Sequence, residues 1–257
     1  MSGRIVCLTL TMLGLAWAGS GLHSPELGRV RDETGALRVI WGVRGNVIPG
    51  DTLADGVVSA SFWGAGGVIK TAGELLVVDA AGRVILRQDA PSGAALFGLP
   101  RRGWRPPVYF PNTNELWQWG GDRWRAVDNV HWDGDPVALG PSGPGWLTVV
   151  VKREDLLWKL TVSARTGAVR RQRPLPGASE PLLVTPQGSI VYIAGDEAVL
   201  RDRDGVERRL SLPAPVIAIE PAAGDWLHLL TAAPSPDLLL RLSPDAPSLC
   251  FLPEGKR

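Results

Sequence analysis

The chain has 257 residues and a formal net charge of +1 at pH 7, and 45% of its residues are hydrophobic and 21% charged. This composition is typical of a globular protein with a sizeable core, and it excludes a disordered or fibrous chain. A near-neutral chain lacks the global positive field that attracts nucleic acids, so we expect no nucleic-acid partner. Its 31 Gly and 22 Pro residues interrupt it at short intervals, which disfavours an all-helical fold.

Residues 1–18 have the pattern of an export signal. Arg4 supplies a positive start, Ile5 to Ala18 is uncharged and mostly apolar, and Ala16-Trp17-Ala18 places small residues at a cleavage site. We predict a mature chain that begins near Gly19 and is periplasmic or secreted. The alternative is an uncleaved N-terminal anchor. No later apolar run reaches about 18 residues, so we expect no stable membrane span in the mature chain.

Residues 19–56 form a segment that does not match the rest of the chain. Short apolar pieces at Arg38 to Trp41 and Asn46 to Ile48 are followed by Pro49-Gly50-Asp51. No four-strand unit fits between Gly35 and Trp63. We therefore predict a non-repetitive lead that packs on the domain formed by residues 57–257. The alternative is the start of an additional repeat unit.

Residues 57–257 contain a repeat. Its apolar runs start 37 to 43 residues apart, at Val68, Val108, Leu147, Ile190 and Leu227. In each unit the run is followed by a hairpin with a short turn, which contains Gly in the first four units, and these four units end with a further strand. A period of about 40 residues is typical of four-stranded propeller blades. By this period and hairpin pattern, residues 57–257 resemble secreted β-propeller repeat proteins.

The resemblance implies an all-β propeller of about five four-stranded blades. The fifth unit lacks its fourth strand, and an open sheet edge leaves backbone groups unpaired. Val57 to Trp63 is a strand-like segment without a unit of its own. We predict that it pairs with the last blade and closes the ring. The alternative is a propeller of six blades.

The second unit is rich in tryptophan. A two-residue turn at Gly120-Gly121 would place Trp117 opposite Trp124 and put both on one face with Trp119. We predict that this indole face packs between neighbouring blades, because large flat side chains fill the space between sheets. The alternative is a platform for a ligand.

The loop at residues 100–107 is the candidate ligand-binding site. Arg101, Arg102 and Arg105 surround Trp104 between flanking prolines. Guanidinium groups bind carboxylates with paired donors, and an indole ring adds a flat contact surface. This combination predicts a site for an anionic or glycan ligand. The alternative is a solvated basic loop in which Trp104 covers the core.

The sequence offers poor signals for catalysis or metal binding. The three histidines are far apart, and we expect His228 to be a structural or channel residue. The acidic groups at Asp133-Gly134-Asp135 and at Asp202 to Gly205 lack the further ligands of a calcium loop and predict turns. Cys250 has no cationic neighbour, which predicts a buried, unreactive thiol. We expect no catalytic residues, metal site or cofactor.

The sequence therefore predicts an exported, non-catalytic propeller, a monomer that binds a protein or glycan through its loop face. An envelope lyase or hydrolase with its site at the channel mouth is one alternative, and a structural module of an envelope assembly is another. The enzyme alternative requires ionisable groups to converge beside a carboxylate in the channel. The candidates for that convergence are Lys70, Tyr109, Tyr192 and His228.

Overall fold

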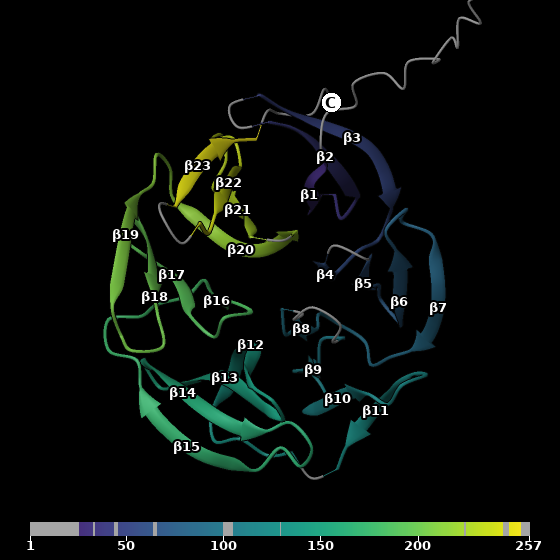
Figure 1. Ribbon diagram of the computed structural model, residues 1–257, viewed down its shortest axis with the longest axis vertical. Helices are drawn as coiled ribbons and strands as arrows, with labels where there is room; N and C mark the ends of the chain where they lie inside the picture. Colours follow the sequence, from purple (N-terminus) through teal and green to yellow (C-terminus); the bar gives the residue numbers. More distant parts are fainter. Residues whose placement is uncertain are drawn as a thin grey trace, which may run out of the picture.

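We describe a computed structural model of the chain. The described residues are 26–32, 34–43, 46–63, 66–99, 105–128, 130–223, 225–243 and 247–252. Within them the chain forms six antiparallel sheets arranged as a ring around a central axis, which is a β-propeller (Figure 1). The predicted all-β propeller is therefore confirmed, with six blades as in the alternative and not five.

Five of the six sheets have four strands and one has three among the described residues. The three-stranded sheet contains β1 (Glu26–Arg31), β2 (Leu37–Val43) and β3 (Asn46–Ala54). The next contains β4 (Ser59–Trp63), β5 (Gly66–Lys70), β6 (Glu74–Asp79) and β7 (Val84–Asp89). It is followed by β8 (Leu96–Phe97), β9 (Val108–Phe110), β10 (Glu115–Trp119) and β11 (Trp124–Val127).

The remaining three sheets complete the ring. One contains β12 (Asp135–Gly143), β13 (Trp146–Arg153), β14 (Leu156–Ser163) and β15 (Val169–Pro174). The next contains β16 (Leu182–Val184), β17 (Ile190–Ala194), β18 (Glu197–Arg201) and β19 (Glu207–Ser211). The last contains β20 (Val216–Ala223), β21 (Trp226–Thr231), β22 (Leu238–Arg241) and β23 (Ser248–Phe251). In each four-stranded sheet the first strand lies nearest the axis and the fourth lies outside (Figure 1).

The predicted closing strand is wrong. The segment Val57 to Trp63 contains β4, which pairs with β5 from Ser59 opposite Lys70 to Trp63 opposite Gly66. Each apolar run that marked a repeat start is the second strand of its sheet, so the fourth strand assigned to each unit is the first strand of the next sheet. The last sheet is complete without a strand from elsewhere, because β20 supplies the strand that the repeat analysis found missing.

The ring closes through side-chain packing on both faces of the three-stranded sheet. Ile40 and Val47 pack in one apolar cluster with Leu239 and Cys250 of the last sheet. Leu37 packs in another cluster with residues of the β4–β7 sheet. No strand is shared between the first and last sheets in the part of the chain that the structure describes. Burial of apolar surface therefore replaces backbone pairing at this junction.

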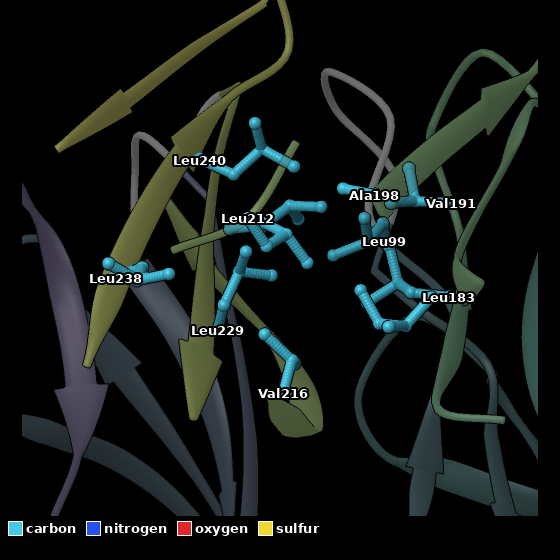
Figure 2. Packing of buried hydrophobic residues seen from close by; sticks show 11 residues of the cluster. Leu99, Leu183, Val191, Ala198, Leu212, Val216, Leu229, Leu238 and Leu240 are labelled. Atoms are coloured by element: carbon cyan, nitrogen blue, oxygen red, sulfur yellow. The ribbon is translucent and has the colours of Figure 1, made fainter. Parts of the chain in front are cut away.

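Successive core residues of one strand pack against the neighbouring sheet on one side and then on the other, because the side chains of a strand point alternately to its two faces. On β13, Val149 and Val151 belong to the cluster shared with β8–β11, whereas Val150 belongs to the cluster shared with β16–β19. Figure 2 shows the corresponding packing between the last two sheets, with Leu229 and Leu238 on one side and Val191 on the other. A strand buried on both faces accounts for the continuous apolar runs that marked the repeat.

The indole face of the second four-stranded sheet packs between sheets, as predicted. Trp124 is buried with residues of the β4–β7 sheet, and Trp117 and Trp119 pack against that cluster. The predicted register is wrong, because Trp119 and not Trp117 lies opposite Trp124. The connection is longer than two residues. The observed register differs from the predicted register by an even number of residues. The indole rings of Trp117, Trp119 and Trp124 therefore still lie on one face of the sheet.

Candidate functional site

A basic groove opens between the β12–β15 sheet and the β16–β19 sheet. One part has a volume of about 180 Å³, and its lining consists of Ser142, Lys159, Thr161, Arg171, Arg173 and Arg203. The second part has a volume of about 450 Å³, and its lining consists of Ser142, Trp146, Thr161, Arg170 and Arg171. The shared residues join the two parts into one depression, which we call the basic groove.

The alternation of β14 places its polar side chains in the groove. Lys159 lies opposite Arg173 of β15, and Thr161 lies opposite Arg171. Directly opposite residues on antiparallel strands point to the same face. Leu160, between the two polar residues of β14, points to the other face and packs in the cluster shared with β8–β11. One strand therefore supplies core contacts on one side and the groove lining on the other.

Lys159 is buried although it is charged. Only 9% of its surface is exposed, and it has no hydrogen bond or ion pair with any described residue. Burial, followed by the nearby charges of Arg173, Arg203 and Arg171, lowers the pKa of Lys159 to about 8. An ammonium group held among guanidinium groups without a carboxylate costs free energy, and a bound anion would offset that cost.

Contacts within the groove fix several of its side chains. Arg173 donates a hydrogen bond to the backbone carbonyl of Arg203 at 3.1 Å, which links the two sheets. The guanidinium carbon of Arg170 lies 4.8 Å from the ring centroid of Trp146. Arg171 has no hydrogen bond or ion pair with a described residue. Its donors are therefore available to a ligand.

Thr148 adds a second unpartnered group beside the groove. It lies opposite Thr161 on the same face of the sheet. Its hydroxyl oxygen is buried and has no hydrogen-bond partner among the described residues. Buried hydroxyl groups usually have partners, and none of the described residues supplies one here.

The groove lies at the same end of the sheets as Arg105, which belongs to the described part of the predicted loop site. Arg105 lies between β8 and β9, the first and second strands of their sheet, and Ser142 lies near the corresponding connection of the next sheet. Arg203 lies in a turn between third and fourth strands. Alternate connections of antiparallel strands lie at the same end of a sheet. The basic groove thus lies one sheet further around the ring, on the face chosen from the sequence.

Of the four predicted ligand-binding residues, only Arg105 lies within the described residues. Arg101, Arg102 and Trp104 lie outside them. The guanidinium carbon of Arg105 lies 4.2 Å from the ring centroid of Trp119. Burial lowers the pKa of Arg105. Its Nη1 atom is buried and has no hydrogen-bond partner among the described residues.

The ionisable residues considered for an enzyme do not converge. They lie on the second strands of four different sheets, and they are Lys70, Tyr109, Tyr192 and His228. Tyr109 donates a hydrogen bond to Asn114, and Tyr192 donates one to Glu207. The hydroxyl groups of Tyr109 and Tyr192 are therefore hydrogen-bonded to residues of their own sheets.

His228 belongs to a network beside the ring junction. Its Nε2 atom lies 3.0 Å from Oδ2 of Asp237, and its Nδ1 atom lies 4.0 Å from Oε2 of Glu220. Glu220 also accepts hydrogen bonds from Arg31 of the three-stranded sheet. Burial opposes ionisation of Asp237, but hydrogen bonds from His228 and Thr231 lower its pKa overall. This network joins the first and last sheets.

The structure also tests two smaller predictions, which concern Cys250 and Asp202. Cys250 is a buried free thiol, as expected. Asp202 accepts hydrogen bonds from the backbone N–H groups of Asp204 and Val206, so this acidic segment is a turn, as predicted. Among the described residues, no group of three or more His, Cys, Asp and Glu side chains is arranged to hold a metal ion. The same part of the chain contains no helix with the length and hydropathy of a membrane span.

The basic groove was not predicted from the sequence. The run Arg170-Arg171-Gln172-Arg173 was a visible signal, because three cations on an outer strand lack interleaved acids. Its convergence with Lys159 and Arg203 depends on the pairing of two strands and the packing of two sheets.

Comparisons with known proteins show the fold and no family. No protein-family model matches the chain, and no curated protein matches it. Hydrazine synthase from Kuenenia stuttgartiensis is similar, with a TM-score of 0.52 and 12% identity over 88% of this chain and 80% of that one. A streptogramin B lyase has a TM-score of 0.50 and 13% identity, over 90% and 84% of the two chains. The WD40 domain of Neurospora crassa Pan2 has a TM-score of 0.50 and 9% identity, over 90% and 81%.

The names of two of these proteins state different enzyme activities and the third names only a domain, and all three are less than 15% identical to this chain. One fold supports many functions, because function depends on the residues of a site and not on the scaffold. The similarity therefore shows that the chain is a β-propeller and assigns it no activity.

Proposed function

We propose that this protein is a non-catalytic binding propeller that holds an acidic ligand in the basic groove. The observation that carries the proposal is the convergence of Lys159, Arg171 and Arg173 without a carboxylate partner among the described residues. Such an arrangement costs free energy in the unliganded protein and favours an anion. The forked donors of arginine suit carboxylates in particular.

A carboxylated glycan fits the groove better than an acidic protein segment. Trp146 lies in the wider part, next to the cationic part. Aromatic rings offer a flat apolar surface, and sugar rings have an apolar face that can cover one. A chain of uronic acids carries both groups at regular spacing.

Isothermal titration calorimetry tests this function with three probes: a galacturonate trisaccharide reduced to its alditol, an oligoglutamate peptide and neutral galactotriose. We expect the galacturonate trisaccharide to bind and galactotriose to give no heat of binding. Arg171→Ala should weaken binding about tenfold or more, because it removes charge-assisted hydrogen bonds. The matched control is Arg123→Ala, an exposed arginine of the turn between β10 and β11.

Absence of binding to both acidic probes would refute the proposal, as would an equal loss of affinity in Arg171→Ala and Arg123→Ala. Tighter binding of oligoglutamate than of galacturonate would replace the glycan by an acidic protein surface. Export and a monomeric state complete the proposed function. Cell fractionation should recover the protein outside the cytoplasm, and mass spectrometry should give an N-terminus near Gly19. Recovery in the cytoplasm alone would contradict export, and a chain that retains residues 1–18 would contradict cleavage after Ala18.

A further inference from the structure

Lys159 differs from an ordinary lysine in three respects that bear on its reactivity. Its side chain is buried at the base of the groove, and it has no partner among the described residues. Three guanidinium groups face it from the neighbouring elements, Arg171 and Arg173 from β15 and Arg203 from the turn between β18 and β19. On β13, the residue directly opposite is the apolar Val150.

These surroundings favour the neutral amine, which is the nucleophilic form. With a pKa of about 8, roughly one tenth of the Lys159 side chains are neutral at pH 7. This fraction is about 300 times that of an ordinary lysine. Desolvation and neighbouring cations are the means by which proteins activate lysine amines. The groove has both, and it is open to solvent through its wider part.

We propose that Lys159 forms an imine with small carboxylates that carry an aldehyde or ketone group, of which the 2-oxo acids are the simplest. This inference rests on the proposed function for the binding of the carboxylate and adds a covalent bond at the same site. The carboxylate would lie against Arg171 and Arg173, which places the carbonyl group beside the Lys159 amine. The volume of about 180 Å³ in this part of the groove suits a small molecule.

The reaction balances without a further reagent. The Lys159 ammonium first gives up one proton, and the Nζ lone pair forms a bond to the carbonyl carbon. One proton moves from Nζ to the carbonyl oxygen, which gives the carbinolamine. The hydroxyl group of the carbinolamine takes up the proton that the ammonium released and leaves as water, while the Nζ lone pair forms the C=N bond. An ammonium group and a carbonyl compound are thereby converted into a protonated imine and one molecule of water.

Reductive trapping tests this inference. The full-length protein is treated with glyoxylate and cyanoborohydride near neutral pH, and peptides are analysed by mass spectrometry for carboxymethyl-lysine. We expect Lys159 to be modified at least about ten times faster than Lys152, an exposed lysine paired with Glu180. Arg171→Ala should slow modification by glyoxylate but not by the neutral aldehyde acetaldehyde. Lys159→Arg should abolish the signal at this position.

Equal or slower modification of Lys159 relative to Lys152 would overturn the inference. An Arg171→Ala effect of the same size on acetaldehyde would overturn the role of the carboxylate. A measurement on the unmodified chain covers the case in which Lys159→Arg does not fold: the reduced galacturonate should protect Lys159 from glyoxylate. If the reduced galacturonate binds and Lys159 stays unmodified, the imine is rejected and the proposed function stands. If the reduced galacturonate does not bind and Lys159 stays unmodified, both the imine and the proposed function are rejected.

Discussion

Lys159 makes the stability of the protein depend on pH. Its folded-state pKa of about 8 lies below the ordinary value of 10.5, because burial and three arginines oppose the charge. Below pH 8 the group is protonated in both states, so the folded protein bears the cost of a buried charge. As the pH rises from 8 to 10.5, the folded state loses the proton before the unfolded state does, and stability increases.

We therefore predict that Lys159→Met stabilises the protein at pH 7, by about 1 to 3 kcal/mol in the free energy of unfolding. The advantage should shrink as the pH rises above 8, because the wild-type lysine then becomes neutral when folded. Urea unfolding at pH 7 and pH 9.5 measures both effects. A variant that is less stable than wild type at pH 7, or a difference that does not change with pH, would contradict the assigned burial of the charge.

Single residues were predicted well where their neighbours in sequence decide their surroundings. Cys250 lies in an apolar run and is buried, and Asp202 precedes a glycine-containing turn and accepts its backbone hydrogen bonds. The groove depends instead on residues that are distant in the chain. Arg203 reaches Lys159 only because two sheets pack together, and the local sequence of neither residue records that packing.

At the scale of elements, Gly66 fixes the start of β5. Its backbone has φ of +145°, and a Cβ atom there would lie 2.1 Å from the carbonyl oxygen of Val78 on β6. The backbone of a paired strand cannot move away without breaking the pairing. We predict that Gly66→Ala lowers the free energy of unfolding by about 2 kcal/mol or more, through strain and overpacking.

The matched control for this prediction is Gly73→Ala in the turn between β5 and β6, where a Cβ atom would meet nothing within 4 Å. Chemical denaturation of the two variants should show a large loss for Gly66→Ala and a change within about 0.5 kcal/mol for Gly73→Ala. Similar losses in both would show that generic glycine effects, and not the contact with Val78, decide the result.

Strands and hairpins were predicted more reliably than their grouping into sheets. The period of about 40 residues follows from alternating apolar runs and turns, and these are local features. A period alone does not reveal where each unit begins. The connection from one sheet to the next resembles the connections within a sheet, so Val57 to Trp63 was assigned to the last sheet although its strand, β4, pairs with β5.

At the scale of the whole molecule, the ring depends on apolar packing at the junction of its first and last sheets. Ile40 of β2 and Leu239 of β22 are each 1% exposed and belong to one cluster. We predict that Ile40→Ala and Leu239→Ala each cost about 2 to 5 kcal/mol. In a double-mutant cycle the two losses should be non-additive by at least about 0.5 kcal/mol, because neighbouring core residues share a cavity.

Additive losses at these two positions would indicate that the junction is not a packed interface. Leu76 of β6 supplies a comparison within the ring, because it is buried in a different cluster from Leu239. The pair Leu76→Ala and Leu239→Ala should be additive within about 0.5 kcal/mol. If the losses of unfolding free energy are coupled for Ile40→Ala and Leu239→Ala but not for Leu76→Ala and Leu239→Ala, the propeller closes through packing against the three-stranded sheet.

The central claim is that the basic groove holds a carboxylated ligand, and a crystal structure of the protein with the reduced galacturonate trisaccharide tests it most directly. We predict that the sugar lies between the β12–β15 and β16–β19 sheets, with a carboxylate within hydrogen-bond distance of Arg171, Arg173 or Lys159. A trisaccharide bound only at the loop of residues 100–107, or elsewhere on the ring with the groove empty, would contradict the claim.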